Sequence, residues 1–329
     1  MIVPVVTIIV PTRDEVADIE GCLESIAAQD HPVNRMEVIV VDGCSSDGTA
    51  DLARRQLGRW GFASSAVLAN EGLTASSNLN LGLSHATGEI VCRVDARTRI
   101  EPHYVRTCVE VLTAHPEIAV VGGAQAAIAR DATARAIGIA RALNNRWSMG
   151  GSPYRRSTTS GVSDTVYLGA FRRDDLERVG GWDERLASNQ DFDLNRRMSR
   201  LGQVWFEASL RSGYVPRRTF PELWRQYLRF GRAKVVYWRT AGDRPNARQR
   251  LLLALPAVSV PLGLAALRSS RTRLPAVVVA VASLAVVEST GSEAPGGGPA
   301  AHALSAVAMT VVAGAWLSGV AREAVHRSG

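Results

Sequence analysis

Short apolar runs alternate with amphipathic segments along the first two thirds of the chain. The β-branched or apolar runs predict buried strands, at Val5–Val10, Glu37–Val41, Ala66–Leu68, Glu89–Val94, Ala119–Gly122, Val166–Phe171 and Gln203–Glu207. The segments with apolar residues at helical spacing predict helices, at Val16–Gln29, Asp47–Leu57, Ala75–His85, Glu101–Ala114, Arg173–Val179 and Asp191–Leu201. This rhythm is typical of an α/β fold with a doubly wound, mostly parallel sheet flanked by helices.

The pattern changes twice along the chain. Ala132–Met149 has a helical pattern, whereas Gly150–Ser163 is rich in Gly, Ser, Thr and Arg and predicts a mobile loop. After residue 250 the composition becomes apolar, and the segments 251–267, 274–288 and 302–320 are almost uncharged. Only the last of these approaches the roughly 20 residues that a helix needs to cross a bilayer.

Charge favours one membrane topology. Arginines flank the segment 251–267 on both sides, which disfavours a simple crossing because positive charge stays cytoplasmic. We expect an interfacial or re-entrant first segment followed by two crossings, with both ends cytoplasmic. Three crossings and a soluble helical domain are the alternatives. Residues 216–250 are basic and aromatic, and they predict amphipathic helices on a surface of anionic lipid.

The overall composition narrows the class of protein. The net charge is +7, from 38 Lys+Arg against 31 Asp+Glu. Aromatic residues are not interleaved with the basic ones as a nucleic-acid stacking platform requires, so we expect no nucleic-acid partner. The four cysteines have no CxxC pairing and no histidine at ligand spacing, which favours reduced thiols over a zinc site or a disulfide framework.

Carboxylates stand where predicted strands end. Asp14 and Glu15 follow the first strand, Asp42 follows the second and Asp95 the fourth. Asp191 stands later, at a predicted helix start. Ligands of α/β folds bind at the carboxyl ends of the strands. The acids therefore predict an enzyme site for a nucleotide, with a metal and a base.

Four sequence blocks carry a family resemblance in this order and spacing. They are VTIIVPTRDE, EVIVVDGCSSDGTADLARR, SSNLNLGLSHATGEIVCRVDART and GGWDERLASNQDFDLNRRMSRLG. Together they resemble family 2 glycosyltransferases with the GT-A fold, especially membrane-linked bacterial members that build exopolysaccharide. The resemblance implies a GT-A nucleotide-sugar transferase domain over 1–215. The composition predicts amphipathic interface helices over 216–250 and a membrane region over 251–329.

The resemblance assigns the first two blocks to the donor. It implies that Pro11, Thr12 and Glu15 line a uracil and ribose pocket. Asp42 would accept a hydrogen bond from the uracil N–H. Asp14 stands where many relatives have Asn. For both Asp14 and Glu15 the alternative is a simple place at the start of the next helix, near its positive end.

The third block departs from the family pattern. Relatives carry Asp-x-Asp here, because the donor diphosphate needs Mg²⁺ or Mn²⁺ and hard cations prefer carboxylate oxygen. This chain reads Asp95-Ala96-Arg97. The resemblance implies Asp95 as a metal ligand or ribose contact, and carries Asn78 to the diphosphate side. Arg97 either points at the diphosphate or is an ordinary surface arginine, and metal dependence stays open.

The last block supplies the base and the acceptor side. Asp191 matches the acid that removes the acceptor hydroxyl proton in an inverting transfer, and the alternative is a helix cap. Trp182 and Asp183 resemble the acceptor-side loop. Gly169 and Ala170 would form the strand beneath the acceptor.

A later segment resembles the Gln-x-x-Arg-Trp element of processive relatives. It contains Gln226 and Arg229, with Phe230 in the place of Trp. Such a helix would close over the donor, with Arg229 meeting phosphate oxygens in a fork. The alternative is an amphipathic helix in the membrane interface. One helix can serve both roles.

The sequence therefore predicts an inverting glycosyltransferase attached to the inner or plasma membrane, with a cytoplasmic catalytic domain. The expected donor is a UDP-sugar, UDP-glucose first, and the expected acceptor is a polyprenyl-linked glycan. A polyprenyl-phosphate sugar synthase is one alternative. A catalytically silent nucleotide-sugar-binding scaffold of an export complex is the other.

Overall fold

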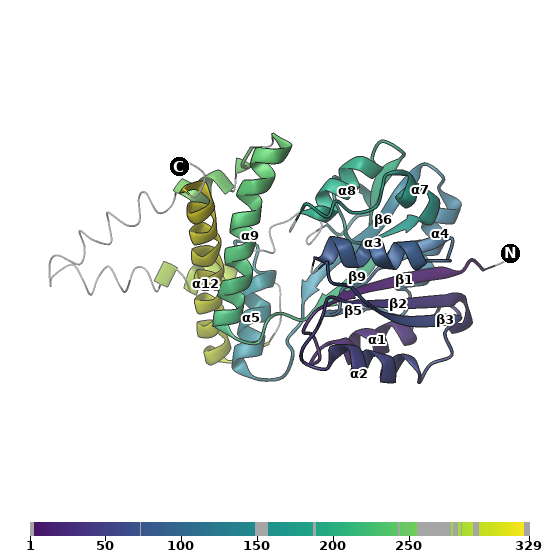
Figure 1. The fold of residues 1–329 in the computed structure, drawn as a ribbon. Helices are drawn as coiled ribbons and strands as arrows, with labels where there is room; N and C mark the ends of the chain where they lie inside the picture. Colours follow the sequence, from purple (N-terminus) through teal and green to yellow (C-terminus); the bar gives the residue numbers. More distant parts are fainter. Residues whose placement is uncertain are drawn as a thin grey trace. The chain divides into compact units, whose positions relative to one another are not determined.

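The chain divides into two compact units, described here from a computed structural model (Figure 1). One unit comprises Met1–Ala126 with Pro153–Val215, and the other comprises Ala127–Ser152 with Pro216–Gly329. The structure describes residues 3–72, 74–148, 157–186, 189–242, 244–247, 249–254, 278, 282–283, 285–291 and 296–325.

The described residues of the first unit form a nine-stranded mixed sheet. Its order is β3-β2-β1-β4-β8-β6-β9-β5, and β7 pairs with β9. The strands are β1 (Val6–Thr12), β2 (Met36–Asp42), β3 (Ser64–Ala69), β4 (Ile90–Arg93), β5 (Thr98–Ile100), β6 (Ile118–Ala127), β7 (Gly161–Val162), β8 (Tyr167–Arg172) and β9 (Gln203–Tyr214). Strands β3, β2, β1 and β4 are parallel, while β8 is antiparallel to both β4 and β6. The parallel half therefore carries the strand ends at which the predicted donor site lies.

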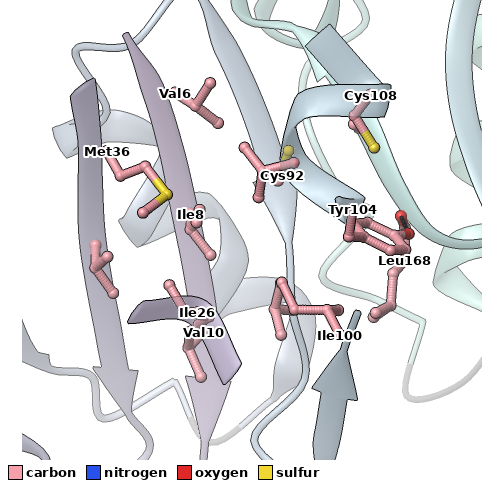
Figure 2. Close-up of a cluster of buried hydrophobic side chains, with 14 of the residues drawn as sticks. Val6, Ile8, Val10, Ile26, Met36, Cys92, Ile100, Tyr104, Cys108 and Leu168 are labelled. Carbon is pink, nitrogen blue, oxygen red and sulfur yellow. Dashed lines mark hydrogen bonds between the residues drawn. The ribbon is translucent and has the colours of Figure 1, made fainter. Parts of the chain in front are cut away.

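Helices cover both faces of this sheet. They are α1 (Ile19–Ala27), α2 (Thr49–Leu57), α3 (Ala75–His85), α4 (Tyr104–Ala114), α7 (Arg173–Arg178) and α8 (Gln190–Met198), with a short 3₁₀ turn η1 (Val33–Arg35). Strand alternation sends Val6, Ile8 and Val10 of β1 to one buried cluster and Ile9 to another. Figure 2 shows the first cluster, where β1 side chains lie among residues from α1, β2, β4 and α4. Because the central strands are buried on both faces of the sheet, their sequences are nearly continuous apolar runs.

The predicted mixed α/β architecture is confirmed, with differences at the second half of the sheet. The predicted strand Gln203–Glu207 continues to Tyr214, and Thr98–Ile100 forms a short strand that the apolar pattern did not indicate. Of the predicted loop Gly150–Ser163, Gly161 and Val162 pair with β9, while residues 150–156 lie outside the described residues. Short edge pairings of this kind carry too few apolar residues for a period-2 signal.

The second unit is built on α5 (Ala134–Asn144), α9 (Phe220–Ala241) and α12 (Pro299–Val325). The expected domain 1–215 is interrupted, because residues 127–152 cluster with the C-terminal residues. The physical reason is close helix packing: a Cβ on Gly138 of α5 would lie 2.8 Å from the carbonyl oxygen of Ala301 in α12. On α9, a Cβ on Gly231 would lie 2.1 Å from the Trp316 carbonyl oxygen. Glycine lets these helix backbones touch.

A polar cluster ties α5 to the C-terminal segment. The buried Arg141 donates from Nε to Glu288 Oε1 at 2.9 Å. His302 Nδ1 lies 2.8 Å from the other oxygen of Glu288. Because a buried charge is stable only when it is paired, this cluster fixes how α5 and α12 meet within their unit.

One described helix is long and apolar enough to cross a membrane by length and composition. It is α12, which contains the predicted segment 302–320. Its 27 residues span about 40 Å, more than a hydrocarbon core of about 30 Å. The segments 251–267 and 274–288 lie mostly outside the described residues, so the number of crossings stays a prediction.

Gly123 in β6 offers a test of the sheet. A Cβ there would lie 1.8 Å from the carbonyl oxygen of Leu210 in the neighbouring strand β9, so Gly123→Ala forces these strands apart. We expect a loss of about 1–3 kcal/mol of unfolding free energy in denaturant titrations. Gly61→Ala is the matched control, because nothing lies within 4 Å of its Cβ position. Equal stability of the two variants would contradict the β6–β9 packing.

Candidate active site

The ends of β1 and β2 form the first part of the site. Thr12 and Asp42 are direct partners in the parallel ladder, and both are buried. The Asp42 carboxylate accepts hydrogen bonds from the Ser45 amide at 2.9 Å and from the Ser45 hydroxyl at 2.5 Å. The Thr12 hydroxyl has no hydrogen-bond partner among the described residues. A buried hydroxyl without a partner is costly, so it marks a place where a ligand atom would be stabilised.

Asp14 joins the loop after β1 to the loop after β2 through hydrogen bonds. It adopts a left-handed backbone, with φ 50°, and its amide donates to the Ser45 hydroxyl at 2.8 Å. Its carboxylate accepts from the Ser46 amide at 2.9 Å. Asp47 adds a further hydrogen bond between these loops, because its carboxylate accepts from the Val16 amide at 3.0 Å. Both acids therefore order these two loops.

Asn78 holds the strand ends from the helix side. Its side-chain amide donates to the carbonyl oxygens of Val41 at 3.1 Å and Thr12 at 3.4 Å. Its own oxygen accepts from Asn70 at 2.9 Å. Pro11 lies opposite Val41 in the same ladder. The structure thus places Asn78 beneath the donor-side loops, and a direct diphosphate contact stays a prediction.

An arginine links the two acids expected to perform the chemistry. Arg93 donates from Nε to Asp95 Oδ1 at 2.7 Å and from Nη2 to Asp95 Oδ2 at 3.3 Å. Its Nη1 donates to Asp191 Oδ1. The Arg93 side chain is 9% exposed, while those of Asp95 and Asp191 are 31% and 46% exposed. The two carboxylates thus meet on one cation at the mouth of the site.

Strand alternation explains this meeting. Arg93 points to the same side of β4 as Val91, whose buried cluster includes Leu194 of α8. Asn189 precedes α8 with φ 64°, a left-handed conformation that Asn tolerates better than most residues. Asp191 consequently stands in the first turn of a helix that packs on the face from which Arg93 projects.

The environment of Asp191 suits a proton acceptor. Burial by the surrounding protein raises the pKa of Asp191, the Arg93 guanidinium lowers it and the Asp95 charge raises it, with a net upward shift. The Asp191 side chain is 46% exposed and in direct contact with Arg93, and both features oppose the upward shift of its pKa. Burial lowers the pKa of Arg93, but Asp191 and Asp95 raise it further, so the guanidinium stays charged.

Arg97 makes a second ion pair. Its Nε lies 3.3 Å from Glu15 Oε1, and the two side chains are 13% and 11% exposed. Its guanidinium also stacks over the Tyr214 ring at 5.0 Å from the centroid. Arg97 is therefore largely buried and paired in the structure, and a contact with the diphosphate stays a prediction. Its charge is matched by Glu15, the residue that the resemblance assigns to the nucleotide pocket.

The described residues offer no site in which protein side chains alone would hold a divalent metal. The described part of the chain contains no group of three His, Cys, Asp or Glu side chains that could hold one. Both oxygens of Asp95 accept from Arg93, and the second acid of the Asp-x-Asp pattern is replaced by Arg97. A metal on Asp95 would have to displace or oppose a guanidinium in direct contact.

Two residues predicted for the acceptor side have structural partners. Trp182 is 2% exposed and packs edge-on against Phe171, with ring centroids 5.9 Å apart. Asp183 accepts two hydrogen bonds from Arg185, at 2.9 and 2.7 Å. These bonds lower the pKa of Asp183. Trp182 therefore belongs to the core, and a role in acceptor binding stays a prediction for both.

The remaining predicted residues fall in both units. Gly169 and Ala170 are buried in β8, directly after Leu168, whose φ of 50° is unusual for a bulky residue. Backbone strain of this kind gathers at functional sites.

Gln226 and Arg229 lie on α9, in the C-terminal unit, and their closing role stays a prediction.

Comparison with known proteins identifies the family. Residues 7–180, more than half of the chain, match the family model described as glycosyl transferase family 2. The chain belongs to this family. It is therefore a glycosyltransferase, and the family expected from the sequence motifs is confirmed.

Relatives agree with this assignment. The chain is 27% identical over 321 residues to a succinoglycan biosynthesis protein of Rhizobium meliloti, covering 96% of this chain and 94% of that one. It is 25% identical to a Methanococcus voltae transferase named for a dolichyl N-acetyl-glucosaminyl phosphate acceptor, over 70% of this chain and 72% of that one. A solved mannosyltransferase from Pyrobaculum calidifontis, in complex with GDP-Man and Mn²⁺, superposes with a TM-score of 0.64 at 21% identity. That match covers 100% of this chain and 89% of the other, and it shows a shared GT-A fold.

Sequence reasoning missed Arg93, the residue that joins Asp95 to Asp191. A signal was present, since Arg93 is a charged residue inside the apolar run EIVCRV and stands two positions before Asp95. Period-2 alternation puts both side chains on one face of the strand. A cation in a buried strand needs an acid nearby, and Asp191 supplies the second one.

Replacing Arg93 by Met tests the ion pair. Arg93→Met leaves Asp95 and Asp191 facing each other, so we expect a loss of about 1–3 kcal/mol of unfolding free energy near neutral pH. Without the Arg93 charge, which lowers the pKa of Asp191, the Asp95 charge raises that folded-state pKa further above the unfolded value. The deficit relative to the parent protein should therefore shrink as the pH is lowered and the acids take up protons. Urea titrations across the acidic range measure this, and a deficit that is independent of pH would contradict the pairing.

Thermal unfolding with Mn²⁺ alone tests the metal-site reading. A resident site at 100 times its dissociation constant would stabilise the fold by about 2.7 kcal/mol. We expect Mn²⁺ to leave the unfolding midpoint of the parent protein unchanged. We expect it to leave the midpoint of Asp95→Asn unchanged as well. A midpoint that rises with Mn²⁺ in the parent protein, but not in Asp95→Asn, would show that a metal does bind at Asp95.

Proposed function

We propose that this protein is an inverting glycosyltransferase that moves a hexose, glucose first, from a UDP-sugar to a lipid-linked glycan. The product would belong to a bacterial exopolysaccharide or another cell-envelope polysaccharide. The single observation that carries the proposal is the Asp95–Arg93–Asp191 cluster at the sheet edge of a family 2 fold.

Several features support a nucleotide-sugar donor. The Pyrobaculum structure with the same fold holds GDP-Man. In this chain the buried Thr12 hydroxyl and the Asp42 carboxylate are neighbours at the carboxyl ends of β1 and β2, the edge at which α/β folds bind nucleotides. The choice of uracil follows from the family resemblance of the Asp42 block.

Asp191 is the proposed base. It would take the proton of an acceptor hydroxyl while that oxygen attacks the anomeric carbon from the side opposite the leaving diphosphate. Arg93 would fix the carboxylate of Asp191 through Oδ1, so that the other oxygen would accept the proton of the incoming hydroxyl. A carboxylate whose pKa is raised accepts a proton better than a fully solvated one.

Guanidinium groups would stabilise the charge that grows on the leaving diphosphate. Arg93 has five N–H groups, and its hydrogen bonds to Asp95 and Asp191 use three of them. The remaining N–H groups, held on a fixed side chain, would donate to phosphate oxygens without reorganisation. Since the described side chains alone offer no site for a divalent metal, no step of this proposal is routed through one.

The lipid-linked acceptor is supported by the relatives and by α12. The Rhizobium relative is named for succinoglycan biosynthesis and the Methanococcus relative for a dolichyl-linked acceptor. An apolar helix that could cross a bilayer suits an enzyme whose acceptor remains in the membrane. We place the catalytic unit on the cytoplasmic face of the plasma or inner membrane, on the charge argument made from the sequence.

A silent nucleotide-sugar binder is the second candidate, since Arg93 occupies Asp191 and the Asp-x-Asp pattern is lost. Turnover separates the two. Tight binding of UDP-glucose without release of UDP, in the presence of lipid-linked acceptors and with or without divalent ions, would favour the binder and refute the enzyme.

Asp191→Asn tests the assignment of the base. We expect kcat to fall by about 10²–10⁴-fold, with an unchanged Kd for the UDP-sugar, because the amide cannot accept the proton. UDP release with membrane acceptor measures the first quantity and calorimetry the second. Asp174→Asn is the control, being an acid 83% exposed on α7. Retention of activity in Asp191→Asn would remove this residue from the mechanism.

A further inference from the structure

Two arginine-rich segments far apart in the sequence meet at one cavity within the C-terminal unit. The cavity has a volume of about 290 Å³ and is lined by residues that precede or begin α5 and α9. Four of the lining residues are arginines, namely Arg130, Arg135, Arg217 and Arg218. A cavity of this size accommodates a phosphate or diphosphate group and part of what is attached to it.

The acids near this cavity are occupied by local hydrogen bonds. Asp131, the acid in its lining, accepts from the Thr133 amide at 2.9 Å and from the Thr133 hydroxyl at 2.5 Å. Glu222 reaches back to the Arg218 amide at 3.0 Å as part of the cap of α9. Within the described residues no ion pair joins an acid to Arg135 or Arg218, and both are exposed. The lining holds four arginines against one acid, Asp131, whose charge interacts with Arg130 and Arg135, so the count of charged side chains in the lining is positive.

Two helix starts add to this charge. Thr133 caps α5 by accepting from the Ala136 amide at 3.3 Å, and Thr219 caps α9 by accepting from the Glu222 amide at 3.4 Å. The amino-terminal end of a helix carries a positive partial charge that favours anions. The helix starts reinforce the arginines, which alone supply planar donors that match phosphate oxygens.

The cavity also has an apolar side. Ala136, Ile139 and Pro216 line it beside the arginines. In the same unit, Trp224 and Phe230 on α9 are each 38% exposed, and Trp224 lies against α12, 3.3 Å from the Cβ position of Gly314. A ligand with a charged head and a long apolar tail fits this combination better than a free anion does.

We propose that this cavity binds the phosphate or diphosphate head of a polyprenyl lipid, whose tail lies along the exposed apolar side chains of α9. The inference rests on the proposed function, because such a lipid is the anchor of the proposed acceptor. It names the part of the chain that would hold the anchor, apart from the residues assigned to the transfer itself.

Binding to vesicles in the absence of donor tests this proposal. Full-length protein is floated with phosphatidylcholine vesicles that contain undecaprenyl phosphate, phosphatidylglycerol at equal negative charge, or neither. The test variant is Arg135→Gln with Arg218→Gln, and the matched control is Arg146→Gln with Arg225→Gln, which removes two exposed charges of the same unit outside the cavity lining. We expect the test variant to lose about 10–30-fold in affinity for undecaprenyl phosphate vesicles, at roughly fivefold per arginine, and the control to lose much less.

Three outcomes would overturn the proposal. They are equal losses in the two double variants, equal affinity of the parent protein for phosphatidylglycerol and undecaprenyl phosphate vesicles, and competition by inorganic pyrophosphate as strong as that by the lipid. The first denies a role for the cavity, the second indicates a general anionic surface, and the third indicates a site for a free anion. Selective loss in the test variant supports the cavity even where no sugar transfer to a polyprenyl acceptor is detected. In that case the proposed function fails and the lipid site stands.

Discussion

The Arg93 guanidinium is the contact on which the rest of the catalytic geometry depends. It joins Asp95, just after the central strand β4, to Asp191, which lies 98 positions after Arg93 in the chain. Two carboxylates this close to one another repel unless a cation lies between them. The pairing therefore sets where α8 starts relative to β4, and it holds the proposed base at the strand edge before any substrate arrives. Preorganisation of this kind avoids a cost at the moment of reaction.

The same cation also bears on how charge would be balanced in the proposed transfer. The Pyrobaculum neighbour is in complex with Mn²⁺, whereas this chain has Arg97 in place of the second acid of Asp-x-Asp, and both oxygens of the first acid accept from Arg93. A guanidinium carries one charge and directional donors, while a divalent ion carries two charges and exchanges its ligands. Arg97 is itself matched by Glu15, so Arg93 is the cation most directly tied to the proposed base.

The sequence predicts the parallel half of the fold and the positions of the site acids well, because both follow from local patterns. Buried strands such as β1 and β2 read as apolar runs, and the acids stand where these runs end. Long-range partners are not local. The pattern predicts a helix around α5, but nothing in residues 132–149 indicates that its partner is α12. Arg93 was passed over because one charge does not disturb the apolar period of its strand, and its meaning depends on Asp191.

The interruption of the catalytic unit by α5 has a consequence for handling the protein. The chain leaves the nucleotide-binding unit after residue 126, returns at residue 153 and leaves again after residue 215. A fragment trimmed to residues 1–215 would keep α5 but discard α12 and α9. The apolar positions Ile139, Ala140, Ala142 and Leu143, now buried, would lose their covering and promote self-association. A fragment meant to contain the first unit alone would therefore omit residues 127–152 as well as the tail.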